Sequence, residues 1–344
     1  MFSPTNYASD ASGYPEMSDI KKSDWLVLAT MWHPVALVDD IGENPHRFIL
    51  LDLPLVIFRT SQGITVARDI CPHRGAPLSM GHMNEDRIIC PYHGLEFAAD
   101  GTCIRIPARE DQSAPIAASF NLHTYRNLVR YGLLWVCLKP EPLLPLPEWP
   151  LLENENVMNN PDTTITVNSE VWEASAPRHV ENFNDPAHLP FVHADSFGNP
   201  EDPRIPEFVV DQTVPHLLRR VKISRSEVNG LKRDFTLVSE LTLPFCSMLV
   251  DQEEDGRIRY AIHDVASPNS AYRSTLYQIA ISECDDPRAQ PEYVLQVNRE
   301  DKALIEKLYP KDYLLNLRNE RHTHADACAV AYKKALVKLG LGAP

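Results

Sequence analysis

The chain has 344 residues, a formal net charge of −14 and 44% apolar residues, a length that fits roughly two domains with a sizeable core. The acidic balance argues against a nucleic-acid surface, because phosphate binding needs clustered Lys and Arg. It is typical of a soluble cytoplasmic protein whose molecules repel one another through their net charge. Residues 1–19 lack the cationic start and apolar core of a signal peptide, and the apolar run 25–38 is too short to span a bilayer. No export or membrane segment is therefore expected.

The first part of the chain is predicted to be all-β up to about residue 138, after a loose arm over residues 1–24 that is rich in Ser, Asp, Pro and Gly. The pair Asp100-Gly101 lies between two short apolar runs and favours a hairpin. The proline density of residues 139–150 excludes regular structure and predicts a linker. The expected strands are residues 47–60, 64–70, 95–99, 102–106 and 133–138.

The second part, residues 151–344, is predicted to be an α+β domain, because strands and helices share one block. Its strands alternate like those of an antiparallel sheet with one wet face. Gly340 is a plausible C-cap for the last helix. The expected strands are residues 164–172, 217–228, 234–243, 258–266 and 275–282, and the expected helices are residues 175–183, 291–308 and 325–339.

Two short loops each offer one thiolate and one imidazole. The sequence CPHRG places Cys71 and His73 together, and CPYHG places Cys90 and His93 together. Two Cys and two His can bind zinc, but small zinc modules depend on the metal to fold, whereas these loops lie in a long sheet domain. The Pro and Gly of each loop also suit backbone N–H groups that turn toward cluster sulfurs.

A second pair of histidines lies in ENFNDPAHLPFVH, residues 181–193. His188 and His193 are five residues apart, which places them about 140° out of register on an ideal helix. They converge only if the helix is broken, and Pro190 is expected to supply the break. Asp185 either shares a face with His188 or caps a turn that begins at Pro186.

The helix predicted over residues 291–308 carries Asp301 within an apolar stripe. A carboxylate there is costly unless it is paired or bound to a metal. The alternative to a metal ligand is an Asp bonded to a buried Lys or Arg. Glu300 and Glu306 are expected to point elsewhere on this helix, into solvent. The stripe consists of Val294, Val297, Asp301, Leu304, Ile305 and Leu308.

The two Cys–His loops closely resemble those of the Rieske family. The resemblance implies a [2Fe–2S] cluster with Cys71 and Cys90 on one iron and His73 and His93 on the other. Respiratory-chain Rieske proteins carry one more Cys in each loop, and this chain has none, so the match is to the oxygenase and ferredoxin branch. The other cysteines are expected to be buried free thiols: Cys103, Cys137, Cys246, Cys284 and Cys328.

With the Rieske loops, the pattern Asn182-X2-Asp185-X2-His188-X4-His193 resembles the mononuclear iron motif of Rieske non-haem iron oxygenases. The resemblance implies an Fe(II) held by His188, His193 and an acidic residue, for which the pair Glu300-Asp301 matches the family and Asp301 is chosen. Asn182 belongs to the motif and is a further candidate. Asp185 would relay electrons to this iron from His93 of a neighbouring subunit, in a closed ring that is most often a homotrimer.

The resemblance also implies an N-terminal all-β Rieske domain over residues 25–138 and a helix-grip-like catalytic domain over residues 151–344, with an antiparallel sheet and flanking helices. The sequences CPHRGAPLSMG, RYGLLWVCL and AYKKALVKLG are most similar to single-subunit oxygenases such as phthalate, vanillate and dicamba enzymes, caffeine demethylases and saxitoxin-pathway hydroxylases. Pro186, directly after the relay Asp, departs from the usual motif.

The implied function is that of a terminal oxygenase, which hydroxylates or demethylates a small aromatic or heterocyclic substrate with O2. No Gly-rich dinucleotide fingerprint is present, so electrons are expected from an NAD(P)H-dependent reductase, directly or through a ferredoxin. One alternative is a ring cis-dihydroxylating dioxygenase. Another, of a different class, is a Rieske electron-transfer protein with a ligand-binding domain.

Overall fold

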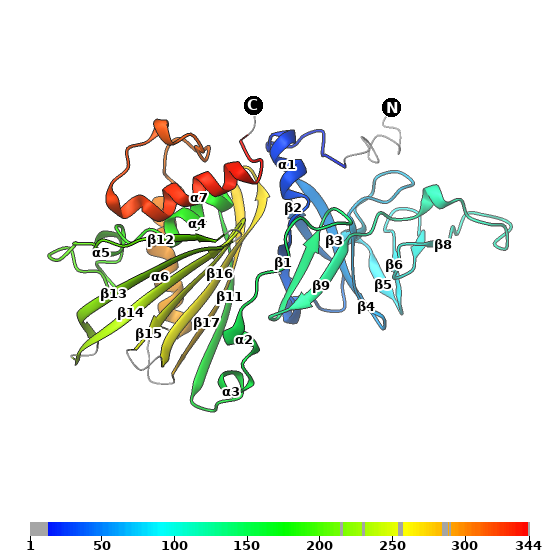
Figure 1. Cartoon of the computed structure of the whole chain (residues 1–344). Coiled ribbons are helices and arrows are strands. Elements are labelled where there is room, and N and C mark those ends of the chain that lie inside the picture. Colours follow the sequence, from blue (N-terminus) through cyan, green and yellow to red (C-terminus); the bar gives the residue numbers. More distant parts are fainter. Residues whose placement is uncertain are drawn as a thin grey trace. The chain divides into compact units, whose positions relative to one another are not determined.

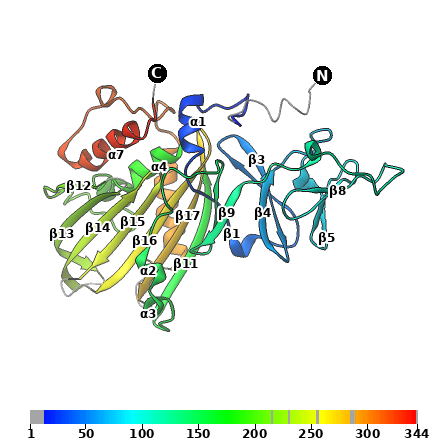
Figure 2. The ribbon, with the colours of Figure 1, turned by 45° about the vertical axis from the view of Figure 1, so that its right-hand side comes forward.

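The structure is a computed structural model, which describes residues 13–213, 216–228, 231–253, 257–283, 288 and 290–342. The chain divides into two compact units, Met1–Pro145 and Leu146–Pro344, drawn in Figure 1 and, turned, in Figure 2. The division falls inside the proline-rich segment 139–150. Among the described residues, no helix is both long enough and apolar enough to cross a membrane.

The first unit is built from small antiparallel sheets, in agreement with the predicted all-β domain. Their strand orders are β1-β10-β9, β2-β3-β4 and β5-β6-β7-β8. The elements are α1 (Lys22–Leu28), β1 (His33–Leu37), β2 (His46–Leu50), β3 (Leu53–Thr60), β4 (Gly63–Arg68), β5 (His82–Asn84), β6 (Arg87–Ile89), β7 (Glu96–Phe97), β8 (Cys103–Arg105), β9 (Arg126–Arg130) and β10 (Leu133–Cys137).

The segment 47–60, predicted to be one strand, is a hairpin of β2 and β3. Leu51 and Asp52 form its turn, with φ of 52° and 61°. This left-handed backbone usually selects Gly or Asn, so the residue types gave no sign of a turn. The hairpin predicted at Asp100-Gly101 is confirmed, because β7 and β8 pair in antiparallel register on either side of it.

Helix α1 begins inside the segment that the sequence predicted to be a loose arm. Before it, Tyr14 donates a hydrogen bond to the carbonyl of Ile20 and packs edge-on against Trp25. Trp25 in turn donates to the carbonyl of Leu51. Residues 1–12 of the predicted arm lie outside the described part of the chain.

The second unit contains an antiparallel sheet of seven strands among the described residues, in the order β11-β17-β16-β15-β14-β13-β12. Figures 1 and 2 show α6 lying against one face of this sheet. The elements are α2 (Pro150–Glu153), α3 (Glu155–Met158), β11 (Thr163–Trp172), α4 (Ala176–Phe183), α5 (Leu189–Val192), β12 (Val210–Thr213), β13 (His216–Val228), β14 (Leu231–Thr242), β15 (Cys246–Gln252), β16 (Ile258–Ser270), β17 (Arg273–Glu283), α6 (Pro291–Ile305) and α7 (Ala327–Lys338).

The prediction of one wet face is wrong for β16, where residues 261–269 are all buried. His263 of this strand packs against Trp149, and Ala261 lies in a cluster that Leu151 covers. The short α2 segment thus adds apolar cover on the face opposite to α6. The alternation holds at the edge strand β11, where Val167 and Val171 are exposed.

The helices match their predicted positions with shorter ends. Helix α4 begins one residue after its N-cap Ser175. Helix α6 ends at Ile305 rather than residue 308, and Leu304, predicted in its apolar stripe, is 47% exposed. Gly340 has φ of 98° just past the end of α7, as expected where a helix must terminate in left-handed backbone.

Candidate metal centres

The two Cys–His loops are closed by the same hydrogen bonds. In the first, the amide of Cys71 donates to the carbonyl of Ala76 and the amide of Gly75 donates to the carbonyl of Cys71. The second repeats this pattern through Cys90, with the amides of residues 90 and 94 donating to the carbonyls of residues 95 and 90. Gly75 and the glycine at 94 both have positive φ, 75° and 68°, which is why Gly follows the ligand pair in each loop.

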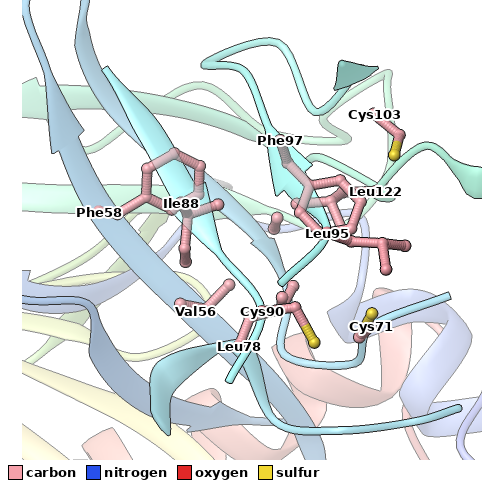
Figure 3. Close-up of a cluster of buried hydrophobic side chains, with 11 residues drawn as sticks. Val56, Phe58, Cys71, Leu78, Ile88, Cys90, Leu95, Phe97, Cys103 and Leu122 are labelled. Carbon is pink, nitrogen blue, oxygen red and sulfur yellow. The ribbon is translucent and has the colours of Figure 1, made fainter. Parts of the chain in front are cut away.

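The sulfurs of Cys71 and Cys90 point toward one another inside the apolar core of the first unit (Figure 3). Each accepts backbone N–H groups from its own loop, in the first from His73. Hydrogen bonding to Cys90 and burial raise the pKa of the Cys71 thiol, and the bond from Cys71 lowers the pKa of Cys90 to about 6. Buried sulfurs that receive backbone N–H groups suit the thiolate ligands of an iron–sulfur cluster.

The two imidazoles stand on the outer side of this pair. The rings of His73 and His93 are 4.5 Å apart between centroids. Nδ1 of His73 is buried and has no hydrogen-bond partner among the described residues, as expected of a nitrogen whose partner is a metal. His93 is exposed, and Tyr92 beside it is 62% exposed. The four groups therefore fit a [2Fe–2S] cluster with one imidazole facing outward.

His188 and His193 flank a helix of a single turn. His188 is the N-cap of α5 and His193 its C-cap, with ring centroids 5.2 Å apart. The expectation that Pro190 breaks a helix between them is wrong. Pro190 lies in the first turn of α5, where a missing N–H costs nothing. His188 keeps helical dihedrals, with φ of −75° and ψ of −27°, whereas His193, with φ of −100° and ψ of 24°, departs from the helical path and brings its ring toward that of His188.

Asp301 of α6 completes the group. Its Oδ1 is 3.4 Å from Nε2 of His188 and 3.4 Å from Nε2 of His193. One ligand atom from each of the three residues lies within 4.8 Å of the others. Oδ1 of Asp301 is buried without a hydrogen bond to the described residues, because 3.4 Å is too long for a strong one. Two imidazoles and one carboxylate arranged in this way fit a mononuclear iron with open positions.

The neighbouring imidazoles and carboxylates change the pKa values of His188 and Asp301. Burial opposes a charge on His188, but the carboxylates of Asp185 and Asp301 raise its pKa to about 9. Burial also opposes a charge on Asp301, and the two imidazoles nevertheless hold its pKa well below the usual range. Both ion pairs of Asp301 among the described residues are with histidine. They do not support the alternative of a buried Lys or Arg partner.

The expectation that Glu300 and Glu306 are solvated is wrong. Oε2 of Glu300 is 2.8 Å from Nδ1 of His193 and accepts a hydrogen bond from Ser196. Burial works against its charge, but these bonds lower its pKa. Glu306 accepts a hydrogen bond from the amide of Glu173. Glu300 thus fixes the ring of a candidate ligand, and only its place beside Asp301 hinted at this.

Asp185 caps the turn at Pro186 and also lies close to the ring of His188. Its Oδ1 accepts the amide of Ala187 at 2.7 Å, and its Oδ2 is 3.5 Å from Nδ1 of His188. The side chain of Asp185 is 29% exposed, so it can be reached from outside the unit. Asn182 is nearly buried on α4 and lines a cavity of about 340 Å³ together with Asp185.

Two family models match the chain. Residues 31–126 match the Rieske [2Fe-2S] domain, and residues 172–341 match the vanillate O-demethylase oxygenase C-terminal domain. The chain is a Rieske non-haem iron oxygenase. As a member of this family it uses a [2Fe–2S] Rieske cluster and a mononuclear iron.

Individual relatives of this oxygenase span nearly its whole length. Methylxanthine N3-demethylase NdmB of Pseudomonas putida is 28% identical over 341 residues, covering 93% of this chain and 92% of the relative. The solved structure of Pseudomonas putida CBB5 NdmB is 25% identical, with a TM-score of 0.74 over 94% of this chain and 97% of that one. Dicamba monooxygenase bound to dicamba shares the fold, at 20% identity and a TM-score of 0.76 over 91% and 97% of the two chains.

Among the described residues, the cysteines outside the Rieske loops belong to no disulfide and to no group of candidate metal ligands. Cys103, Cys137 and Cys246 are buried free thiols, as predicted, and Cys328 is buried and forms no disulfide. Burial raises the pKa of Cys103 and of Cys246, which keeps them in the unreactive thiol form. Cys284 lies outside the described residues.

Proposed function

We propose that this oxygenase removes a methyl group from a nitrogen or oxygen atom of a small heterocyclic or aromatic substrate. The observation that carries the proposal is the group formed by His188, His193 and Asp301, in a chain that aligns over nearly its full length with a methylxanthine demethylase. In the reaction, one oxygen atom of O2 enters the methyl group and the other leaves as water. Two electrons and two protons are consumed, and the hydroxymethyl product releases formaldehyde.

The residues divide the work between two sites. Cys71, His73, Cys90 and His93 would hold the Rieske cluster, and His188, His193 and Asp301 the mononuclear iron. When bound, the cluster supplies single electrons and the iron a place for O2 beside the substrate. Glu300 accepts a hydrogen bond from Nδ1–H of His193, so that Nε2 is free to face the metal.

The proposal includes electron transfer between subunits of a homotrimer. Asp185 has one oxygen 3.5 Å from Nδ1 of His188 and is partly exposed, and His93 is exposed on its own unit. A carboxylate reachable from outside and an outward imidazole can meet across a subunit boundary. Asn182, beside Asp185 on the same cavity, would support this contact.

A turnover assay with a surrogate reductase tests the reaction. Purified protein is supplied with NADH, O2 and a panel of N-methyl and O-methyl heterocycles and aromatics. The expected result is formaldehyde released in proportion to O2-dependent NADH use. A product that retains both atoms of labelled O2 as a diol would instead indicate a ring cis-dihydroxylating dioxygenase.

Iron content separates the oxygenase from a plain electron carrier. An oxygenase holds about three iron atoms per chain and a carrier about two. The expected value is about three. A value of about two, with full Rieske absorption, would favour an electron-transfer protein whose second unit binds a ligand.

Mixed assemblies test transfer between subunits. Chains with Cys90→Ser, which lack the cluster, are refolded or co-expressed with chains carrying Asp301→Ala, which lack the mononuclear iron. Each variant alone should be inactive, and the mixture should recover activity if electrons cross from one subunit to the next. An inactive mixture of proven mixed composition would contradict the relay, and light scattering of the wild type checks the trimer.

A further inference from the structure

A row of polar side chains crosses the buried face of the catalytic sheet. In the strand register, Asn168 lies opposite Gln278, Gln278 opposite Asp264, and Asp264 opposite Ser247. These four residues, here called the polar row, therefore stand side by side on β11, β17, β16 and β15. Asp264 is fully buried, and Gln278 and Ser247 nearly so. Polar groups at this depth are costly unless each is hydrogen-bonded.

Helix α4 is bonded to one half of the polar row. Nε2 of His179 is 2.7 Å from Oδ1 of Asp264, and both side chains are buried. At the end of the helix, Asn184 donates to Oγ of Ser247 at 2.8 Å and accepts from Ser239 at 2.8 Å. The segment that follows carries the relay carboxylate and the first histidine of the metal site.

Helix α6 is bonded to the other half. Asn298 donates to Oε1 of Gln278 at 2.8 Å, and Nε2 of Gln278 donates to Oδ2 of Asp264 at 2.7 Å. Asn168 also donates to Oε1 of Gln278, at 3.2 Å. Asn298 lies three residues before Asp301, on the same side of the helix. One continuous chain of hydrogen bonds thus runs from α4 through the sheet to the helix of the third ligand.

The carboxylate of Asp264 determines which group donates and which accepts in each of these hydrogen bonds. Oδ2 of Asp264 accepts from Gln278, so Gln278 turns its NH2 toward Asp264 and its oxygen toward Asn298. The amide of Asn298 is then held as a donor. The orientation of two amides, which could otherwise flip, thus follows from a single buried carboxyl group.

We propose that the polar row holds α4 and α6 in a common register and so positions the two halves of the mononuclear iron site. Asp264 and Gln278 are its central positioning residues. The inference rests on the proposed iron ligands. Ligands must keep their places to within about 0.5 Å, and His188 and Asp301 come from segments that no short loop connects. Both segments are instead bonded to one row of the same sheet.

Gln278→Met tests the central link, because methionine has a similar length but no amide. We expect Fe(II) bound about 10- to 100-fold more weakly, as for other residues that orient metal ligands, with the Rieske absorption unchanged. The EPR spectrum of nitric oxide bound to the remaining mononuclear iron should change. In metal-free protein, amide exchange should speed up in both α4 and α6.

Thr275→Val is the matched control for lost stability. Thr275 lies on the same strand, donates a buried hydrogen bond to Asn269 at 2.9 Å, and faces the side opposite to Gln278. This variant should lower the midpoint of thermal unfolding to a comparable degree. Its iron affinity and nitric oxide spectrum should remain those of the wild type.

Reversing the donor-to-acceptor direction of these hydrogen bonds should restore part of the lost iron affinity. Asn298→Asp alone leaves a carboxylate next to the oxygen of Gln278 as well as next to its NH2, so the oxygen loses its donor. Asp264→Asn alone removes the carboxylate that orients the amide of Gln278. The double variant restores one acceptor-only group, so Gln278 can turn its amide around and bond to the side chains at positions 264 and 298, while Asn168 turns its own amide to match. Iron affinity in the double variant should exceed that of Asn298→Asp.

Two results would overturn the inference: wild-type iron affinity and spectrum in Gln278→Met, or additive losses in the double variant. A failure of the proposed iron site looks different, because the wild-type protein itself would then hold only about two iron atoms per chain. In that case, unchanged amide exchange of α4 and α6 in metal-free Gln278→Met would still contradict the positioning role.

Discussion

The two candidate metal centres differ in how far their proposed ligands are separated along the chain. The Cys–His loops lie within residues 71–93, and each closes through hydrogen bonds between its own residues. The proposed mononuclear site joins α5 to α6, and His193 is hydrogen-bonded to a carboxylate 107 residues away in sequence. A centre whose ligands are close in sequence depends on the residue types within each loop, and their spacing can be recognised in the sequence. A non-local centre depends on how the sheet places two helices, and it should therefore be the more easily disturbed from a distance.

The largest expected effect removes the iron of one centre and leaves the other centre intact. Asp301→Ala should abolish oxygenation, by more than about 100-fold, because even changes around the ligands cost about 10- to 100-fold. Iron should fall from about three to about two atoms per chain, while the Rieske absorption stays. Iron analysis and visible spectra measure both. Glu292→Ala, which removes an exposed carboxylate from the same helix, is the control, and full iron in Asp301→Ala would disprove the assignment.

Acid should weaken both units alike, through histidines that bind no metal. Burial lowers the pKa of His33 in the first unit and of His263 in the second to about 4. Below pH 6.5 the unfolded chain takes up a proton that the folded chain refuses until about pH 4, so stability falls as the pH drops. Between pH 7 and pH 5 each histidine should cost about 2 kcal/mol of unfolding free energy.

Urea unfolding at the two pH values measures this loss. His33→Gln and His263→Gln should each reduce the pH dependence of the free energy of unfolding. A pH dependence equal to that of the wild type in both variants would show that other groups cause the acid sensitivity.

The bond from Glu300 to His193 belongs only to the non-local centre. Glu300→Gln keeps the size of the side chain but removes the charge that orients the imidazole and raises its basicity. Fe(II) affinity should fall about 10-fold or somewhat more, with no change in the Rieske spectrum. Titration of metal-free protein with Fe(II) measures the affinity. Glu292→Gln on the same helix should behave as wild type, and equal affinity in both variants would exclude Glu300 from this role.

A last pair of expected effects contrasts one glycine from each centre. A Cβ on Gly198 would lie 2.4 Å from the carbonyl oxygen of Leu189 and 2.9 Å from the carbonyl carbon of His193. Gly198→Ala should therefore shift the α5 turn and cost about 1–3 kcal/mol, with loss of mononuclear iron. Gly75 has open space around it but φ of 75°, so Gly75→Ala should cost about 1 kcal/mol from backbone strain.

Thermal unfolding and iron analysis of both variants check this contrast. Gly42→Ala is the control, because Gly42 has open space and no left-handed backbone. If Gly198→Ala keeps all its iron, the turn that carries His193 is more tolerant than its packing indicates.

The all-β character of the first unit and the α+β character of the second could be read from hydrophobic alternation and turn pairs. The hairpin at Asp100-Gly101 was legible because that pair demands a tight turn. The turn at Leu51 and Asp52 was not, since an apolar residue in left-handed backbone is held by its surroundings. Strand formation depends on neighbouring strands in the sheet as well as on local residue types. The strands missed for this reason are β1, β5, β6, β9, β12 and β15.

By itself, the sequence determined the chemistry of the centres: two Cys–His loops with matching glycines, a His pair beside Asp185, and an Asp within an apolar helix stripe. Tertiary structure alone decided that Glu300 turns inward to His193, that His188 and His193 stand at the two caps of α5, and that a polar row crosses the sheet beneath α4 and α6. Spacing along the chain governs contacts within a loop or a helix. Contacts between segments a hundred residues apart depend on strand register and packing, which residue types do not specify locally.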